Sequence, residues 1–307
     1  MLSNPGDRLR IDLQRRDIIP LIGVYDVFSA SVAGRHFDGI FISGFSFAAS
    51  YYGLPDIGYI AWPDIVAFVQ RVRAILPLHH VVVDIDDGYA DVEVACHVVR
   101  QLEALGASGV VLEDQQRPRK CGHLDGKQIM ELDGFVDKLQ RVLDTRNDLF
   151  VVARTDAIEP EEAIVRAHRF AAAGADAVLV EGVQDLDLLR NLRNEVDCPL
   201  VFNQIAGGKS PPATLDQLSS AGVSLVNYST PCLFAAHDAV NATMSALKQD
   251  DGRLAVLRPG SMDVKSCTQL LNQNCEGLVS PGSSAGFRHE LPLATASIQG
   301  KSASDSE

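Results

Sequence analysis

The 307-residue chain is predicted to fold as an α/β protein, a (β/α)₈ barrel of the TIM type with extra helices at its C-terminal end. Two observations carry this prediction. Eight short apolar runs rich in β-branched residues alternate with helical patterns, and nearly every run ends in a polar or charged residue. A parallel barrel gathers the carboxyl ends of its strands at one mouth, where the chemistry of such folds is found.

The elements follow one another in a regular order. A short charged helix at the N-terminus is expected to cap the barrel. The expected strands cover residues 20–25, 39–43, 81–86, 109–113, 149–154, 177–181, 199–203 and 224–228. Apolar residues at about every third or fourth position predict helices over 62–76, 91–105, 135–146, 160–173 and 215–221.

The end of the chain departs from this rhythm. Helical patterns over 241–249 and around 264–274 are typical of helices that close a barrel or dock on a neighbour, which favours a homo-oligomer. From residue 278 onward Ser, Gly, Ala and Pro dominate, so 278–307 is predicted to be disordered. Residues 1–277 are expected to form a single barrel domain.

Composition limits the function. A net charge of −13 and a pI near 5.0 argue against nucleic acid or an anionic membrane as the main partner. No apolar run reaches the roughly 20 residues of a membrane span, and the first residues have no signal-peptide pattern, so a cytoplasmic protein is expected. The six cysteines form no CxxC pair, which favours reduced thiols.

The stretch 81–88 is the strongest local signal for chemistry. A buried strand ends in Asp84, Asp86 and Asp87, and in an extended chain Asp84 and Asp86 point to the same side, where carboxylates suit Mg²⁺ or Mn²⁺. Taken alone, the stretch also fits a strand followed by an acidic turn. The functional interpretation is favoured because polar groups recur at the other strand ends.

Long loops add further candidates. After the second expected strand, Ser43 and Gly44 begin a stretch of small residues whose amides suit a carboxylate. In the loop after the fourth strand, Cys121 lies among basic residues that are expected to lower its pKa and make it reactive. Arg154 follows the fifth strand and suits bidentate binding of a carboxylate. Residues 207–210, Gly-Gly-Lys-Ser, lack the Walker spacing and indicate a flexible substrate loop.

Taken together, the motifs resemble the isocitrate lyase / phosphoenolpyruvate mutase superfamily, in the same order along residues 23–211. The matching motifs are Gly-Val-Tyr-Asp at 23–26, Ser-Gly at 43–44, Leu-Pro-Asp at 54–56, Asp-x-Asp at 84–86, Leu-Glu-Asp-Gln at 112–115, Lys-Cys-Gly-His at 120–123, Ala-Arg-Thr-Asp at 153–156, Val-Glu at 180–181, and Asn203 with Gly-Gly-Lys-Ser-Pro at 207–211. The Lys-Cys-Gly-His motif resembles the carbon–carbon lyase branch, which includes the 2-methylisocitrate lyase and petal death protein types.

The resemblance implies a homodimer or homotetramer, and it implies a role for each matching residue. Asp84, Asp86 and Glu113 would hold Mg²⁺, with Mn²⁺ as the alternative, largely through water. Cys121 would protonate the enolate left by retro-aldol cleavage, with Arg154 and Glu113 beside it and His123 orienting its loop. The residues expected to bind substrate are Tyr25, Ser43, Gly44, Phe45, Asp56, Gly122, Arg154, Glu181, Asn203 and Ser210.

Three departures from the family pattern bear on the substrate. Ala206 stands where the family often has a glutamate, which weakens the case for methylisocitrate itself, and Asp87 adds a charge near the metal. The aromatic residues in the loop after the second expected strand suggest a bulkier or more apolar substrate end; they are Phe45, Phe47, Tyr51 and Tyr52.

The sequence therefore predicts a Mg²⁺-dependent lyase that cleaves a 2-hydroxy di- or tricarboxylate to a 2-keto acid and a carboxylate. Two alternatives stay open. The first is a phosphonopyruvate or oxaloacetate hydrolase, decarboxylase or mutase that uses the same metal site and does not need Cys121. The second is a barrel that binds a ligand without turning it over.

Overall fold

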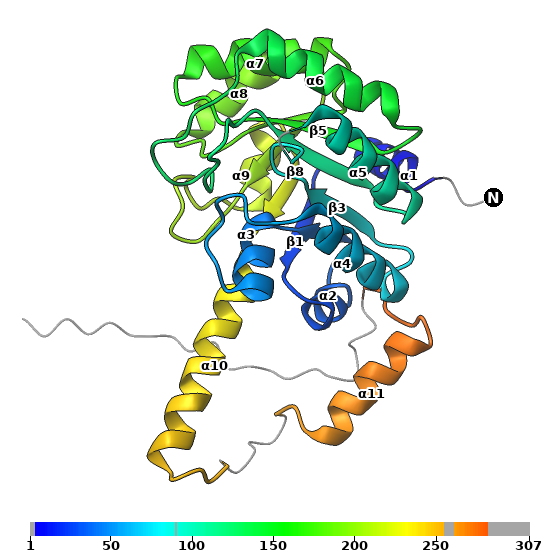
Figure 1. The fold of residues 1–307 in the computed structure, drawn as a ribbon, viewed down its shortest axis with the longest axis vertical. Helices are drawn as coiled ribbons and strands as arrows, with labels where there is room; N and C mark the ends of the chain where they lie inside the picture. Colours follow the sequence, from blue (N-terminus) through cyan, green and yellow to red (C-terminus); the bar gives the residue numbers. More distant parts are fainter. Residues whose placement is uncertain (1–3, 90, 255–260, 282–307) are drawn as a thin grey trace, which may run out of the picture.

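The computed structural model describes residues 4–89, 91–254 and 261–281, which contain a closed barrel of eight parallel strands (Figure 1). Each strand pairs with the next one in the chain and β1 pairs with β8, so the sheet has no free edge. The predicted (β/α)₈ barrel is confirmed. Its strands are β1 Ile19–Val24, β2 Gly39–Ile42, β3 His80–Asp84, β4 Gly109–Glu113, β5 Phe150–Thr155, β6 Ala177–Val180, β7 Leu200–Asn203 and β8 Val223–Tyr228.

Helices surround the barrel, and the five predicted between strands are present with small shifts at their ends. They are α4 Trp62–Ile75, α5 Val92–Ala104, α6 Leu132–Thr145, α7 Pro160–Ala172 and α9 Leu215–Ser220. The sequence analysis misses α2 Val27–Ala33 and α8 Leu186–Glu195, which span only 7 and 10 residues and so display little periodicity. Aspartate side chains cap both, since Asp26 accepts from Ser29 N and Asp185 from Asp187 N.

The barrel interior is apolar at its N-terminal end. The helix α1 Pro5–Arg15 closes this end, where Leu9 joins the inward-facing side chains of the strands. The buried residues of this inner cluster are Leu9, Ile19, Leu21, Phe41, Val82, Val111, Phe150, Val152, Ala177, Leu179, Val201 and Leu225. The N-terminal helix therefore completes a packed core, as its predicted capping role requires.

The interior turns polar at the opposite end. Because side chains alternate along a strand, the residue two positions after an inward-facing apolar residue also points inward. Val82 is followed in this way by Asp84, and Val111 by Glu113. The same step leads to Arg154, Glu181, Asn203 and Asn227. The inward-facing positions of the strands therefore form an apolar layer, followed toward the carboxyl ends by a layer of buried polar and charged side chains.

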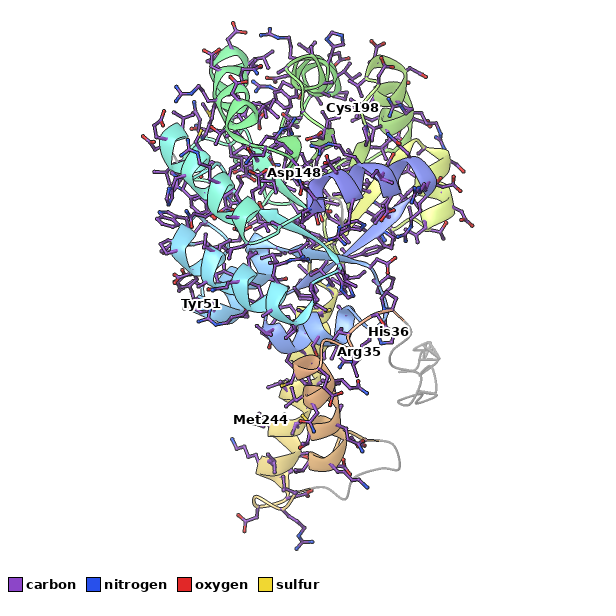
Figure 2. All side chains as sticks on the ribbon, turned by 90° about the vertical axis from the view of Figure 1, so that its right-hand side faces the viewer. Arg35, His36, Tyr51, Asp148, Cys198 and Met244 are labelled. Carbon is purple, nitrogen blue, oxygen red and sulfur yellow. The ribbon has the colours of Figure 1, made fainter. Side chains whose placement is uncertain are left out.

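Two late helices extend away from the barrel (Figures 1 and 2). The helix α10 Pro231–Gln249 begins ten residues before the predicted 241–249 segment, directly after β8, and has no buried residue. The helix α11 Val264–Cys275 is tied to α2 by Arg35, whose Nη2 donates to the carbonyl of Leu270 at 3.0 Å. Among the described helices, none combines the length and apolarity of a membrane span.

The predicted disordered tail falls mostly on residues 282–307, which lie outside the described residues. Of its first residues, Val279 is buried against the outer core, the apolar cluster formed by the strands and the helices around them. At this position the composition of the tail therefore does not prevent ordered packing.

Replacing Leu9 with alanine tests the role of α1 in the inner core. Leu9 is 0% exposed, so the variant should lower the free energy of unfolding by about 2–5 kcal/mol. On the same helix, Ile11 is 36% exposed, and its alanine variant should cost less than about 1 kcal/mol. Urea denaturation measures both; equal losses would mean that α1 does not close the barrel.

Candidate active site

A small cavity of about 20 Å³ lies at the carboxyl ends of the strands. Polar side chains from most strands converge on it, as the barrel geometry predicts. Its lining residues are Ser43, Phe45, Asp56, Asp84, Cys121, Gly122, His123, Arg154, Glu181, Asn203, Ile205 and Ser229. All of these except Ile205 and Ser229 belong to the set predicted from the sequence, so the structure brings this part of the predicted set together in one place.

The two aspartates of the metal motif are close together, but not for the predicted reason. Strand β3 ends at Asp84, and Asp86 has a left-handed backbone with φ of 51°, so the alternation of an extended strand does not apply. The turn instead brings Asp86 N to within 3.1 Å of Asp84 Oδ1. Gly44 packs on this pair, because a Cβ at that position would meet Asp86 Oδ1 at 3.0 Å and Asp84 Oδ2 at 3.2 Å.

Two buried guanidinium groups balance these carboxylates. Arg119 forms ion pairs with Asp56, Asp86 and Glu113, and Arg154 Nη1 lies 3.1 Å from Glu113 Oε2. Burial raises the pKa of Glu113 to about 7, although both arginines act to lower it. The site is therefore a buried cluster of charges in which two arginines face several carboxylates.

The carboxylates fit a hydrated magnesium ion. Asp86 Oδ1 and Glu113 Oε2 are buried and accept no hydrogen bond, although they lie 3.3 Å from Arg119 Nη2 and 3.1 Å from Arg154 Nη1. These ion pairs therefore leave lone pairs on both oxygens for a further positive group. Oxygen donors of this kind suit Mg²⁺. In the described part of the chain, no three His, Cys, Asp or Glu side chains converge closely enough to bind an ion directly. The arrangement suits an ion that keeps most of its water ligands.

Cys121 lies on the loop between β4 and α6 and is 8% exposed at the cavity wall. The sequence-based expectation that basic neighbours lower its pKa is wrong: burial raises the pKa of this thiol to about 11. Arg119 is turned toward the carboxylates, and Lys120 Nζ donates to the carbonyl of Asp125. At neutral pH Cys121 is therefore a protonated thiol, which suits an acid better than a nucleophile.

Glu181 links the cysteine loop to the far side of the cavity. Its Oε1 lies 2.7 Å from His123 Nε2, and it accepts from Asn203 Nδ2 at 3.1 Å. His123 Nδ1 in turn accepts from the backbone N–H of Lys209 at 2.9 Å. His123 therefore connects two loops that cover the cavity.

Arg154 is held in place by acidic neighbours on three sides. Its Nε lies 2.9 Å from Asp156 Oδ2 and 3.4 Å from Glu181 Oε2. Burial disfavours the ionised form of Asp156, but Arg154 and Lys127 outweigh burial and hold its pKa at about 2. Asp156 thus stays charged and fixes the arginine that lines the cavity.

The structure leaves some predicted residues outside the cavity wall. Asp86 and Glu113 are buried behind it among the ion pairs, and Gly44 donates its N–H to Asp84 Oδ2 at 3.4 Å. Tyr25 and Ser210 are not among the lining residues.

The aromatic loop is only partly oriented toward the cavity. Phe45 lines it, but Phe47 is buried in the outer core and Tyr51 is 60% exposed. The loop folds as the short helix α3 Gly44–Phe47 followed by the π-helix η1 Ala48–Tyr52. The predicted bulky aromatic wall is therefore reduced to a single ring.

Two lining residues are not among the predicted site residues. Ile205 supplies an apolar wall, and Ser229 donates its hydroxyl to Asn203 Oδ1 at 2.6 Å. Ser229 directly follows the last strand, so the sequence indicates its place at the mouth but not a role in the site, whereas Ile205 carries no such signal.

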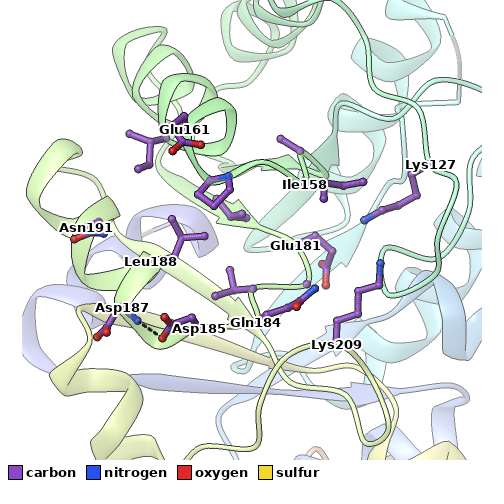
Figure 3. Close-up of a pocket in the computed structure, with 16 residues that line it drawn as sticks. Lys127, Ile158, Glu161, Glu181, Gln184, Asp185, Asp187, Leu188, Asn191 and Lys209 are labelled. Atoms are coloured by element: carbon purple, nitrogen blue, oxygen red, sulfur yellow. Dashed lines mark hydrogen bonds between the residues drawn. The ribbon is translucent and has the colours of Figure 1, made fainter.

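A wider hollow lies beside the cavity and shares Glu181 with it (Figure 3). Lys127 and Lys209 line it, but Lys127 is bound to Asp156 at 2.7 Å and Lys209 to Asp125 at 2.6 Å. Glu181 is the single predicted site residue in this wall. The predicted chemistry therefore belongs to the smaller cavity.

The raised pKa of Cys121 can be checked by alkylation with iodoacetamide. Only the thiolate reacts, so the rate at Cys121 should rise about tenfold per pH unit from pH 7 to pH 10, without a plateau below about pH 10. Mass spectrometry of the cysteine peptides separates Cys121 from exposed Cys275. A plateau near pH 7 would show instead that the basic neighbours do lower the pKa.

Comparisons with known proteins agree with this geometry. The family profile described as phosphoenolpyruvate phosphomutase matches residues 9–248. The 2-methylisocitrate lyase of Aeropyrum pernix is 35% identical over 231 residues, covering 74% of each chain, and the petal death protein of Dianthus caryophyllus is 36% identical over 233 residues, covering 74% of this chain and 73% of its own. A crystal structure of 2,3-dimethylmalate lyase superposes with a TM-score of 0.83 at 25% identity, covering 94% of this chain and 100% of that one. The chain therefore belongs to the phosphoenolpyruvate mutase family within the isocitrate lyase / phosphoenolpyruvate mutase superfamily, whose members are enzymes that include carbon–carbon lyases.

Proposed function

We propose that the protein is a Mg²⁺-dependent lyase that cleaves a 2-hydroxy di- or tricarboxylate of the alkylmalate or 2-methylisocitrate type into a 2-keto acid and a carboxylate. The observation that carries the proposal is a protonated thiol, Cys121, in the same small cavity as Asp84 and Arg154. A lyase of this type needs an acid for carbon beside groups that balance carboxylate charge. The lyases among the similar proteins support the same reaction class.

The cavity favours a compact substrate with an alkyl substituent. Phe45 and Ile205 supply apolar wall, while Arg154 and Asn203 supply donors for a carboxylate. The cavity holds only about 20 Å³ in this structure, so the covering loops must open before a substrate enters, and an alkylmalate requires less opening than a larger tricarboxylate. Ala206 in place of the family's glutamate agrees with this preference.

The proposed reaction is a retro-aldol cleavage. The 2-hydroxyl gives its proton to a carboxylate that lines the cavity, such as Asp56, and its oxygen becomes the carbonyl oxygen of the 2-keto acid. The bond between C2 and C3 breaks, and its electron pair passes to C3 as the enolate of the departing carboxylate. Cys121 then donates its thiol proton to C3, while Arg154 faces the negative charge and His123 keeps the cysteine loop in place. Mg²⁺ bound near Asp84, Asp86 and Glu113 would supply positive charge for the substrate carboxylate and the 2-oxygen.

A panel of substrates tests the reaction class. With Mg²⁺ present, release of 2-keto acid, measured with a coupled dehydrogenase, should be fastest for an alkylmalate such as 2,3-dimethylmalate, followed by 2-methylisocitrate. If every alkylmalate and methylisocitrate is inert, the proposal fails.

A second function is considered because the matching family profile is that of a phosphomutase. Phosphonopyruvate or oxaloacetate chemistry would use the same metal site and would not need the thiol. Replacing Cys121 with alanine separates the two functions: the lyase should lose at least about three orders of magnitude in kcat, because the acid for C3 is gone. The alternative should lose little.

Cys198 offers a matched control for that experiment. Burial raises the pKa of its thiol to about 11 as well, but Cys198 does not line the cavity. Its alanine variant should keep near wild-type activity. Equal losses in both variants would mean that the effect is structural.

Replacing Asp84 with asparagine tests the metal site. Loss of one carboxylate charge should weaken Mg²⁺ binding at least about tenfold, measured by isothermal titration calorimetry. Asp87 is the control, because its carboxylate pairs with Arg117 at 2.8 Å, so Asp87→Asn should change the affinity much less. Unchanged binding by the Asp84 variant would place the metal elsewhere.

A further inference from the structure

Arg119 is a buried arginine at the mouth of the barrel that contacts three carboxylates. Its side chain is 1% exposed, and each of its three nitrogens faces a different carboxylate. Nε lies 2.8 Å from Glu113 Oε1, Nη2 lies 3.3 Å from Asp86 Oδ1, and Nη1 contacts Asp56. The three acids come from β4, from the turn after β3 and from the long connection after β2. One guanidinium thus joins three separate segments of the mouth.

The contacts of Arg119 also hold the loop that carries Cys121. Arg119 precedes Cys121 by two residues, on the same loop between β4 and α6. Beyond the cysteine, this loop is held by His123 on Glu181 and by Lys127 on Asp156. Arg119 is the corresponding attachment on the side of the carboxylates proposed for the metal.

We propose that Arg119 is a positioning residue that fastens the cysteine loop to Asp86 and Glu113, so that the loop and the metal ion share these two carboxylates. This inference rests on the metal site of the proposed function. Arg119 is assigned no contact with the reacting atoms; it acts through the placement of Cys121. Asp86 Oδ1 and Glu113 Oε2 take part in ion pairs with Arg119 and Arg154 but accept no hydrogen bond, so lone pairs remain on these acids for the metal ion or its water ligands.

The shape of the side chain makes arginine necessary. A guanidinium presents N–H donors in several directions within one plane and can face three acids at once, whereas a lysine has a single nitrogen. Arg119→Lys should therefore keep the charge but lose the attachment. Arg119→Met should lose both.

Loss of the Arg119 charge and loss of the loop attachment should change two different measurable properties. Arg119 and Arg154 are the two guanidinium groups that face the acidic cluster, so loss of one makes the cluster more negative and should tighten Mg²⁺ binding by about tenfold. Loss of the attachment should at the same time release the loop and expose Cys121. A role limited to stabilising the fold would not tighten metal binding.

The test uses the full chain with Arg119→Met, Arg119→Lys and the control Arg117→Met. Arg117 lies on the same loop and forms its ion pair with Asp87, so its variant removes an equal charge without touching Asp86 or Glu113. Mg²⁺ affinity is measured by calorimetry. Loop release is measured as the rate of iodoacetamide reaction at Cys121, read by peptide mass spectrometry.

The inference predicts that Arg119→Met binds Mg²⁺ about tenfold more tightly and that its Cys121 reacts at least about tenfold faster than in wild type. Arg119→Lys should show the faster reaction with an affinity near that of wild type, and Arg117→Met should change neither. An unchanged reaction rate in both Arg119 variants, or weaker Mg²⁺ binding by a folded Arg119→Met, would overturn it. If Arg119→Met does not fold, as judged by circular dichroism, the lysine variant decides.

The same data separate this inference from the proposed function. Failure of the wild-type protein to bind Mg²⁺ would remove the shared metal site, and with it both proposals. Normal Mg²⁺ binding together with an unchanged Cys121 rate in the Arg119 variants would overturn the inference alone.

Discussion

The mouth of the barrel depends on charge balance among buried groups. Asp84, Asp86 and Glu113 are each less than a tenth exposed, and removing an ionised carboxylate from water is costly unless opposite charges surround it. Arg119 and Arg154 supply that opposite charge. Because Arg119 comes from a loop and Arg154 from strand β5, satisfying the carboxylates also fixes how the loop lies over the barrel. The same ion pairs therefore stabilise the mouth of the barrel and set the geometry of the site.

This balance prepares the cavity for carboxylate chemistry. Arg154 faces the cavity but is restrained by Asp156, so it is preorganised for an anionic substrate. The protonated thiol of Cys121 stands on the same wall, held between Arg119 and His123 along one loop. An acid for carbon beside a fixed positive charge is what cleavage to an enolate requires. The narrow volume agrees with a loop that covers the site.

Much of the barrel and of the site could be predicted because both follow strand alternation. Asp84, Glu113 and Asn203 end their strands, and Arg154 lies one residue before the end of β5, each one inward step after an apolar core residue. The left-handed turn at Asp86 could not be predicted, since it depends on packing against Gly44. The high pKa of Cys121 also depends on where its neighbours point, and the sequence shows only that they are near in the chain.

The most direct test of the account is cleavage of 2,3-dimethylmalate in D₂O with Mg²⁺, followed by NMR of the products. Retro-aldol cleavage conserves atoms by giving pyruvate and propionate. With an enzyme acid fixed on one face of the enolate, propionate should carry one deuterium at C2 in a single configuration. Absence of cleavage of this and of every other alkylmalate and methylisocitrate, or deuterium in both configurations, would contradict a lyase in which Cys121 delivers the proton.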